Sequence, residues 1–184
     1  GWTTTFGIKT PKCVSDYNLD GIDDLLFSDH QGDTYKGRAV LLYGRSSWPS
    51  VLNVSSSSSF NGVTFLSQLS GMAYLGTAIN SVDLNVDGHA DLVISAFGAE
   101  SARGNVHVIW GGQVLTTPFY LPVSLPNKGC YFRGPVDGTQ WGYAIAIGDI
   151  NGDKNKDLLF TGSSSQTVIV VFASTTATWS LGMS

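Results

Sequence analysis

Short apolar runs separated by polar, glycine-rich segments dominate the chain, and they recur in the same order three times. The runs are rich in Val, Ile, Leu, Phe and Tyr and are bounded by Gly, Asn, Asp and Ser, which is the pattern of β-strands. No sustained 3.6-residue periodicity with helix caps accompanies them, so the pattern predicts an all-β protein with little helix. The predicted strands cover 25–27, 39–43, 63–66, 75–82, 92–94, 106–110, 130–132, 141–147, 158–160 and 168–172.

A nine-residue motif precedes one strand of each set, with Asp at positions 1, 5 and 9 and Asn at position 3. Its three copies begin at Asp16, Asp83 and Asp149, which lie 67 and 66 residues apart. A near-constant period of this kind is the signature of a repeat architecture. With about four strands per repeat, the sequence predicts three blades of a β-propeller, at about 1–70, 71–135 and 136–184. A β-sandwich or a β-solenoid is the alternative.

The motif also has the composition of a calcium-binding loop, because Ca²⁺ takes about six to eight oxygen ligands. Positions 1, 3, 5 and 9 supply side-chain oxygens, and position 7 supplies its backbone carbonyl. The alternative is an Asp-rich turn without metal, in which the converging carboxylates would repel one another. We therefore predict three Ca²⁺ sites. The candidate ligands are Asp16, Asn18, Asp20, Ile22 and Asp24 in the first loop, Asp83, Asn85, Asp87, His89 and Asp91 in the second, and Asp149, Asn151, Asp153, Asn155 and Asp157 in the third.

The third loop departs from the pattern at position 6, where Lys154 replaces the glycine found as Gly21 and Gly88. A second difference is Gly152, two positions earlier. Because a non-glycine residue with positive φ is uncommon, we expect a strained or differently shaped turn. The third site is accordingly predicted to be the weakest of the three.

Charge supports the metal interpretation and excludes some partners. Nine of the 14 acidic residues stand at the ligand positions of the loops, and three bound Ca²⁺ ions would bring the formal net charge from −4 to +2. The basic residues are scattered, so we expect no nucleic-acid partner. No apolar run reaches the length of about 18 residues that a transmembrane helix needs, so no transmembrane segment is predicted.

The loops, their flanking strands and their period resemble FG-GAP repeats, which build the β-propeller of integrin α subunits. The glycines of that signature correspond to Gly76 and Gly142, and less closely to Gly7, while the second half of the signature is degenerate. The resemblance implies a propeller with calcium loops on one face and adhesion ligands generally on the other. It carries no ligand-contact motif that can be transferred to this chain.

Three blades are fewer than the roughly four to eight that close a propeller. An open arc would expose sheet edges and apolar faces, which favours association. We therefore expect a protein partner or self-association to complete the propeller, or a longer polypeptide that includes this segment.

No G-x-S-x-G, H-E-x-x-H or phosphate-binding glycine loop is present, so we predict a non-catalytic chain. The preferred interpretation is a calcium-stabilised extracellular or cell-surface module for adhesion, recognition or structural assembly. The alternative is the accessory propeller domain of a secreted phospholipase or polysaccharide-degrading enzyme.

A few residues outside the loops carry further hypotheses. Asn53 begins an Asn-Val-Ser sequon and is a candidate glycosylation site if the chain is secreted. The five Trp residues could line a glycan site, but packing between blades is the preferred interpretation. For Cys13 and Cys130 the preferred interpretation is two buried or free thiols. A single long-range or intermolecular disulfide is the alternative, and the sequence does not decide between them.

Overall fold

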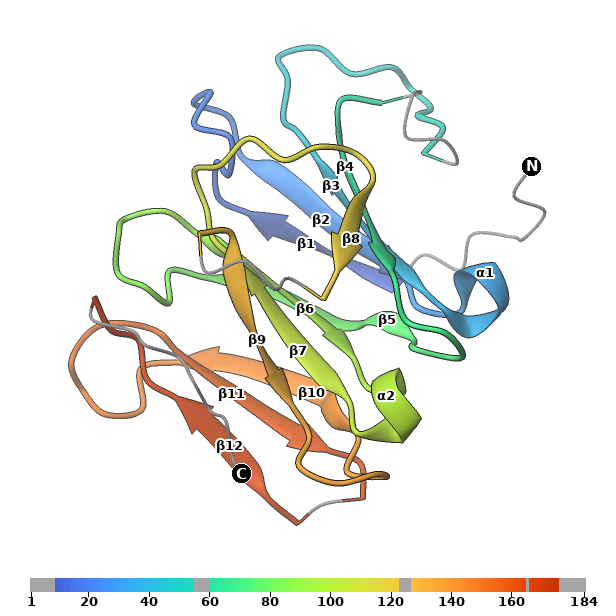
Figure 1. Cartoon of the computed structure of the whole chain (residues 1–184). Helices are drawn as coiled ribbons and strands as arrows, with labels where there is room; N and C mark the ends of the chain where they lie inside the picture. Colours follow the sequence, from blue (N-terminus) through green and yellow to red (C-terminus); the bar gives the residue numbers. More distant parts are fainter. Residues whose placement is uncertain (1–8, 55–59, 123–126, 165, 176–184) are drawn as a thin grey trace.

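The computed structural model describes residues 9–54, 60–122, 127–164 and 166–175, and these residues form an all-β protein (Figure 1). The first sheet has the strand order β1-β2-β3-β4-β8, the second β5-β6-β7-β9, and the third β10-β11-β12. Neighbouring strands are antiparallel, except that β8 runs parallel to β4. None of the sheets closes on itself. The strands are β1 (Lys9–Val14), β2 (Asp24–Asp29), β3 (Arg38–Leu42), β4 (Gly62–Ser67), β5 (Leu75–Val82), β6 (Asp91–Ala96), β7 (Asn105–Ile109), β8 (Phe119–Leu121), β9 (Gly129–Arg133), β10 (Trp141–Gly148), β11 (Asp157–Gly162) and β12 (Val168–Val171).

Every predicted run overlaps an observed strand, so the prediction of an all-β protein is confirmed. The predicted runs include neither β1 nor β8, and β8 leaves the second repeat and joins the edge of the first sheet. The ring of Phe119 meets Phe65 edge-on, with centroids 5.8 Å apart. The carbonyl of Leu121 accepts a hydrogen bond from the N–H of Gln68 at 2.8 Å. A three-residue strand is too short to show a periodicity, and its pairing depends on this distant neighbour.

The two short helical turns, α1 (Gly32–Tyr35) and α2 (Ala99–Ala102), are left-handed. Three successive non-glycine residues in each have φ between 50° and 66°. This conformation costs about 1–2 kcal/mol per residue, so neighbouring contacts must hold it in place. The carbonyls of Tyr35 and Lys36 accept hydrogen bonds from the first strand of the second sheet and the residue before it. The carbonyls of Ala102 and Arg103 accept the equivalent hydrogen bonds from the first strand of the third sheet and the residue before it. Each turn therefore holds the start of the next sheet in the chain by backbone hydrogen bonds.

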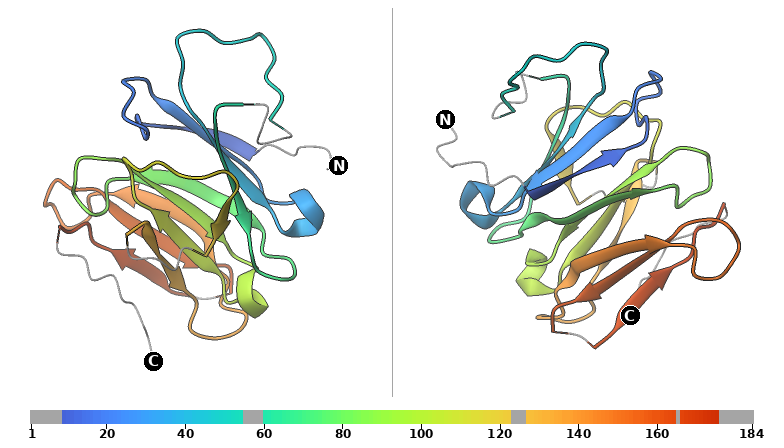
Figure 2. Two further views of the ribbon diagram at one scale, coloured as in Figure 1. Left: turned by 45° about the horizontal axis from the view of Figure 1, so that its top comes forward. Right: turned by 180° about the vertical axis from the view of Figure 1, so that it is seen from behind.

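The three sheets stack face to face, with β5 in contact with both β2 and β10 (Figure 2). One apolar core, which includes Leu26, Phe65 and Ile94, fills the space between the first and second sheets. Another, which includes Val108, Phe132 and Phe160, fills the space between the second and third. The three Asp-rich loops gather at one end of this stack, and α1 and α2 lie at the other (Figure 1).

Candidate metal centres in three equivalent loops

Each Asp-rich loop joins the first and second strands of its sheet, and the first Asp closes the loop onto itself. The carboxylate of Asp16 accepts hydrogen bonds from the N–H groups of Asp20 (2.9 Å) and Gly21 (2.6 Å). The second loop repeats both bonds with Asp83 as the acceptor, at 3.0 and 2.9 Å. In the third loop Asp149 accepts from Gly152 and Lys154, at 2.7 and 2.9 Å.

Positions 3 and 5 are linked to one another in the same way in all three loops. The side-chain nitrogen of Asn18 donates to the carboxylate of Asp20 at 2.9 Å, and its oxygen accepts from the Asp20 N–H at 3.2 Å. The other oxygen of Asp20 accepts from the N–H of Ile22 at position 7. The structure therefore brings positions 1, 3 and 5 together on the inside of a tight turn. The corresponding residues are Asn85, Asp87 and His89 in the second loop and Asn151, Asp153 and Asn155 in the third.

The Asp at position 9 has different surroundings, because it is buried and accepts two backbone hydrogen bonds. Asp91 is completely buried and accepts from the N–H groups of Leu84 and Gly111, both at 2.9 Å. Gly111 lies two residues beyond the third strand of the sheet, so this carboxylate ties the loop to that strand. The same pair of bonds forms at Asp24, from Tyr17 and Gly44, and at Asp157, from Ile150 and Ala173. Sequence reasoning treated position 9 only as a ligand and missed this structural role.

Burial also changes the acidity of two carboxyls at position 9, those of Asp91 and Asp24. Loss of solvation raises the pKa of Asp91 to about 7, although the bonds from Gly111 and Leu84 act in the opposite direction. The negative charges of Asp87 and Asp83 raise this pKa further. Burial raises the pKa of Asp24 for the same reason. A cation in the loop would favour the charged form of such a carboxyl.

Within the described ranges, no three or more His, Cys, Asp or Glu side chains form a group that could hold a metal ion. The donors that converge in each loop are two carboxylates and one Asn amide, while the third carboxylate bonds to the strands. These donors are all oxygens, and hard oxygen ligands suit Ca²⁺ rather than Zn²⁺. The donor chemistry therefore fits calcium, and the three sites stay a prediction.

In the third loop Lys154 has the positive φ that led us to expect an altered turn, and Asp149 accepts from the N–H of position 4, Gly152, where the other loops use position 5. Lys154 has φ 76°, close to the 88° of the equivalent glycines in the other two loops. At position 4 the relation is reversed: Gly152 has φ 82°, while Leu19 and Val86 have φ 62° and 57°. Every loop thus holds two left-handed residues, of which one is a glycine. Strain therefore gives no reason to rank the third site as the weakest.

The remaining candidate residues have varied surroundings. Asn53 is exposed, while Ser55 of its sequon lies outside the described residues. Cys130 is a free, half-buried thiol whose pKa is raised to about 12 by burial, so it is poorly reactive. The side chain of Cys13 lies outside the described part of the chain. Trp141 is buried between the second and third sheets, as expected for a packing role.

Two other tryptophans are described. Trp110 packs against the same core as Trp141, whereas Trp48 is 47% exposed with the guanidinium of Arg45 over its ring. Trp2 and Trp179 lie outside the described residues. In the part of the chain that the structure covers, no helix has the length and apolar character to cross a bilayer.

The fold and the loops together define an all-β protein of three similar stacked sheets, each with an Asp-rich loop at the same end. No model of a known protein family matches the chain. The chain is similar to the phosphatidylinositol-glycan-specific phospholipase D of Dictyostelium discoideum, with 28% identity over 82% of this chain and 16% of that protein. The Bos taurus protein of the same name is 28% identical over 86% of this chain and 18% of its own length. The Mus musculus protein is 37% identical over 47% of this chain.

Proposed function

We propose that this chain is a non-catalytic, calcium-stabilised propeller segment that serves as an accessory domain of an extracellular phospholipase specific for phosphatidylinositol-glycans. The observation that carries this proposal is the coverage of the similarity. It extends over 82–86% of this chain but only 16–18% of the Dictyostelium discoideum and Bos taurus proteins, which is the relation of one domain to a larger enzyme. The comparisons favour this accessory role over the adhesion module that the sequence first suggested.

The polar residues of the chain support a structural role. The clustered carboxylates of the loops bond to loop and strand backbone, which is the behaviour of groups that shape a turn. The chain also lacks the recognised nucleophile and metal-hydrolase motifs. We therefore assign catalysis to another part of the enzyme and stability or positioning to this one.

Calcium would be held by the oxygens of positions 1, 3 and 5, with position 9 and the position 7 carbonyl as further ligands. The bound ion would neutralise the carboxylates that the loop brings together. At ten times the dissociation constant, each site adds about 1.4 kcal/mol to the free energy of unfolding, and three independent sites add about 4 kcal/mol. That is a large part of the roughly 5–15 kcal/mol typical of a domain. Extracellular modules meet the calcium concentrations that such sites need.

Propeller geometry is supported by the way the sheets pack. The first strand of the second and third sheets lies against the preceding sheet, and the Asp-rich loops share one end of the stack (Figure 1). The resemblance to FG-GAP repeats adds the expectation that the three sheets are blades around a common axis.

The calcium proposal is tested by thermal unfolding of the chain in CaCl₂, in MgCl₂ and in EGTA, together with metal analysis of the purified protein. We expect bound calcium and a melting temperature higher by roughly 10 °C in CaCl₂ than in EGTA. The triple variant Asp20→Ala, Asp87→Ala and Asp153→Ala is the control, and it should lose most of this response. Absence of bound calcium together with an unchanged melting temperature would contradict the proposal.

The accessory role is tested by incubating the chain with a phosphatidylinositol-glycan-anchored protein and measuring release of that protein from the membrane. We expect no release by this chain alone. Release that scales with the concentration of the purified chain would show that it is catalytic.

A further inference from the structure

Tyr17, the second residue of the first Asp-rich loop, bonds to the second sheet on both sides of one residue. Its side chain is completely buried. Its hydroxyl donates a hydrogen bond to the carbonyl of Trp110 at 2.7 Å, and its carbonyl accepts one from the N–H of Gly112 at 3.1 Å. The residue between these two partners is Gly111. The first loop therefore fixes the position of residues 110–112, which follow β7 (Figure 1).

The same segment shapes the second loop. The N–H of Gly111 donates to the carboxylate of Asp91 at 2.9 Å, and Asp91 is the candidate ligand at position 9 of that loop. The backbone also packs closely there, because a Cβ at Gly111 would lie 2.5 Å from the carbonyl oxygen of Ala90 and 2.9 Å from the Cβ of His89. His89 stands at position 7, whose backbone carbonyl is another candidate ligand. Residues 110–112 thus contact the first loop and also two ligand positions of the second.

The second and third loops are connected by an equivalent link with one bond fewer. The carbonyl of Leu84, at position 2 of the second loop, accepts a hydrogen bond from the N–H of Ser174 at 2.9 Å. The preceding residue, Ala173, donates to the carboxylate of Asp157 at 3.0 Å, which is position 9 of the third loop. Leucine has no hydroxyl, so its side chain cannot supply the second bond that Tyr17 makes. The loops are thus linked in chain order, and the first link is the stronger.

We propose that Tyr17 is a positioning residue for the second calcium site, so that calcium in the first loop raises the calcium affinity of the second. The inference rests on the proposed calcium function. An ion that orders the first loop also restrains Tyr17, and Tyr17 then holds Gly111 against Asp91 and His89. The second ion therefore meets a loop that is already partly ordered, and it binds at a smaller entropic cost.

Two features distinguish this coupling from general stabilisation by calcium. Thermodynamic linkage makes it reciprocal, so the second ion must raise the affinity of the first loop by the same factor. Its size must also follow the bonds at position 2, so it is larger between the first and second loops than between the second and third. Couplings between binding sites are typically about 5- to 150-fold in affinity, and a path of two hydrogen bonds places the first pair near the lower end, at about fivefold.

Calcium titration by calorimetry tests the proposal in the chain whose third loop is inactivated by Asp153→Ala. Adding Asp20→Ala leaves the second loop active, and adding Asp87→Ala instead leaves the first. The product of the two association constants in the two-site chain, divided by the product of the single-site constants, gives the coupling factor. We expect a factor of about five, with each loop binding calcium more weakly by this factor when the other is inactivated.

The variant Tyr17→Phe tests the role of the hydroxyl in this coupling. It keeps the ring and every candidate ligand, and the carbonyl of Trp110 keeps the hydrogen bond that Gln113 donates at 2.9 Å. We expect the coupling factor to fall to about two, since the carbonyl bond to Gly112 remains. Tyr120→Phe removes a hydroxyl at a 49% exposed position on β8 and is the matched control, which should leave the factor unchanged.

A coupling factor of one would overturn the proposal, because the two loops would then bind calcium independently. A factor that Tyr17→Phe leaves unchanged would overturn it as well, even if the variant lowers the melting temperature in EGTA, since Tyr17 would then have a structural role alone. Either result would leave the proposed calcium function intact. Failure of the unmodified chain to bind calcium would contradict both that function and this inference.

Discussion

Single residues show how the Asp-rich loops tolerate sequence variation. Each loop needs left-handed backbone at positions 4 and 6, and a single glycine serves at either one. Val86 and Gly88 occupy these positions in the second loop, and Gly152 and Lys154 in the third. The exchange keeps the number of left-handed non-glycine residues constant, and the hydrogen bond from the N–H of position 6 to the first Asp is kept in all three loops.

Replacement of Gly152 by Ala should therefore destabilise the protein by about 1–2 kcal/mol, because both left-handed positions of the loop, 152 and 154, would then carry side chains. Gly148→Ala is the matched control. A Cβ meets no atom within 4 Å at either glycine, but only Gly152 has a positive φ. Chemical denaturation of the two variants measures the difference. Equal stabilities would mean that the backbone at Gly152 is not strained by a side chain.

A buried histidine makes stability depend on pH. Burial lowers the pKa of His107 to about 3, and its Nδ1 has no hydrogen-bond partner among the described residues. In the unfolded chain its pKa returns to about 6.5, so the unfolded state binds more protons between these values. Stability is therefore lost as the pH falls from about 6.5 toward 3.

The variant His107→Phe should remove this part of the acid sensitivity. Relative to the original protein, it should gain up to about 3 kcal/mol between pH 7 and pH 4. Thermal unfolding of both proteins across this range gives the comparison, in which other acidic groups contribute equally. Parallel stability curves for the two proteins would contradict the prediction.

At the scale of elements, the Asp-rich loop is held by two separate sets of bonds. Positions 1, 3 and 5 form the turn, while position 9 joins the turn to the third strand of the sheet. In the second loop, Asp87 represents the first set and Asp91 the second. The two sets predict different responses to calcium.

Removal of Asp91 as Asp91→Ala leaves the N–H groups of Leu84 and Gly111 without their acceptor in a buried site. We expect a loss of about 2–4 kcal/mol with or without calcium, because each unsatisfied group costs roughly 1–3 kcal/mol. Asp87→Ala should lower stability mainly in CaCl₂, since its carboxylate is exposed and would serve the ion. Unfolding in CaCl₂ and in EGTA separates the two outcomes. A calcium-independent effect of Asp87→Ala as large as that of Asp91→Ala would contradict this division.

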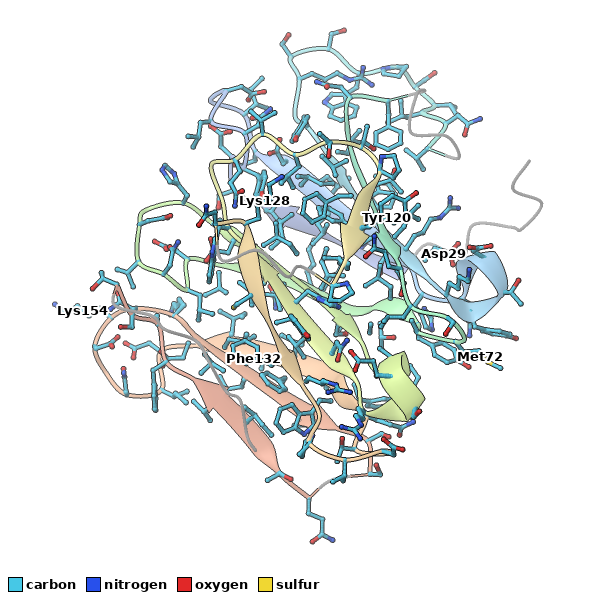
Figure 3. The ribbon with its side chains drawn as sticks, viewed as in Figure 1. Asp29, Met72, Tyr120, Lys128, Phe132 and Lys154 are labelled. Carbon is cyan, nitrogen blue, oxygen red and sulfur yellow. The ribbon has the colours of Figure 1, made fainter. Side chains whose placement is uncertain are left out.

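At the scale of the whole molecule, the loops connect sheets as well as strands. In the first two loops the second residue, Tyr17 or Leu84, is buried and its carbonyl accepts a hydrogen bond from the segment that follows the third strand of the next sheet. A change in either loop therefore reaches the junction beside it. Figure 3 shows the spread of the molecule, with Lys154 in the third loop and Asp29 beside α1 at the opposite end. Loops one and two each border a junction between two sheets, whereas the second residue of loop three, Ile150, is 49% exposed.

One matched pair of variants measures how much the burial of the second loop residue contributes to stability. Leu84→Ala, at a fully buried position, should destabilise the protein by about 2–5 kcal/mol. Ile150→Ala, at the equivalent but 49% exposed position, should change stability by less than about 1 kcal/mol. Urea denaturation of the two variants provides the test. Similar losses would mean that the third loop already packs against another part of the protein.

The repeat, most of the strand positions and the oxygen donors of the loops could be read from the sequence, because each depends on residues close together along the chain. Strand alternation and the spacing of Asp16, Asn18 and Asp20 are local properties. Neither the attachment of β8 to the first sheet nor the second role of Asp91 could be predicted in this way. Strand β8 pairs with β4 of another repeat, and Gly111, which donates to Asp91, lies 20 residues away beyond β7. No local pattern identifies these partners.

Local pattern likewise does not distinguish Val106 from Val168, since both stand in short β-branched runs after the same motif. Packing alone decides that one is buried and the other exposed, because burial depends on whether another sheet lies opposite. The amino-acid sequence by itself thus determined what each repeat is made of. Only the tertiary structure decided which of its apolar faces are covered, because that depends on neighbours brought together by folding.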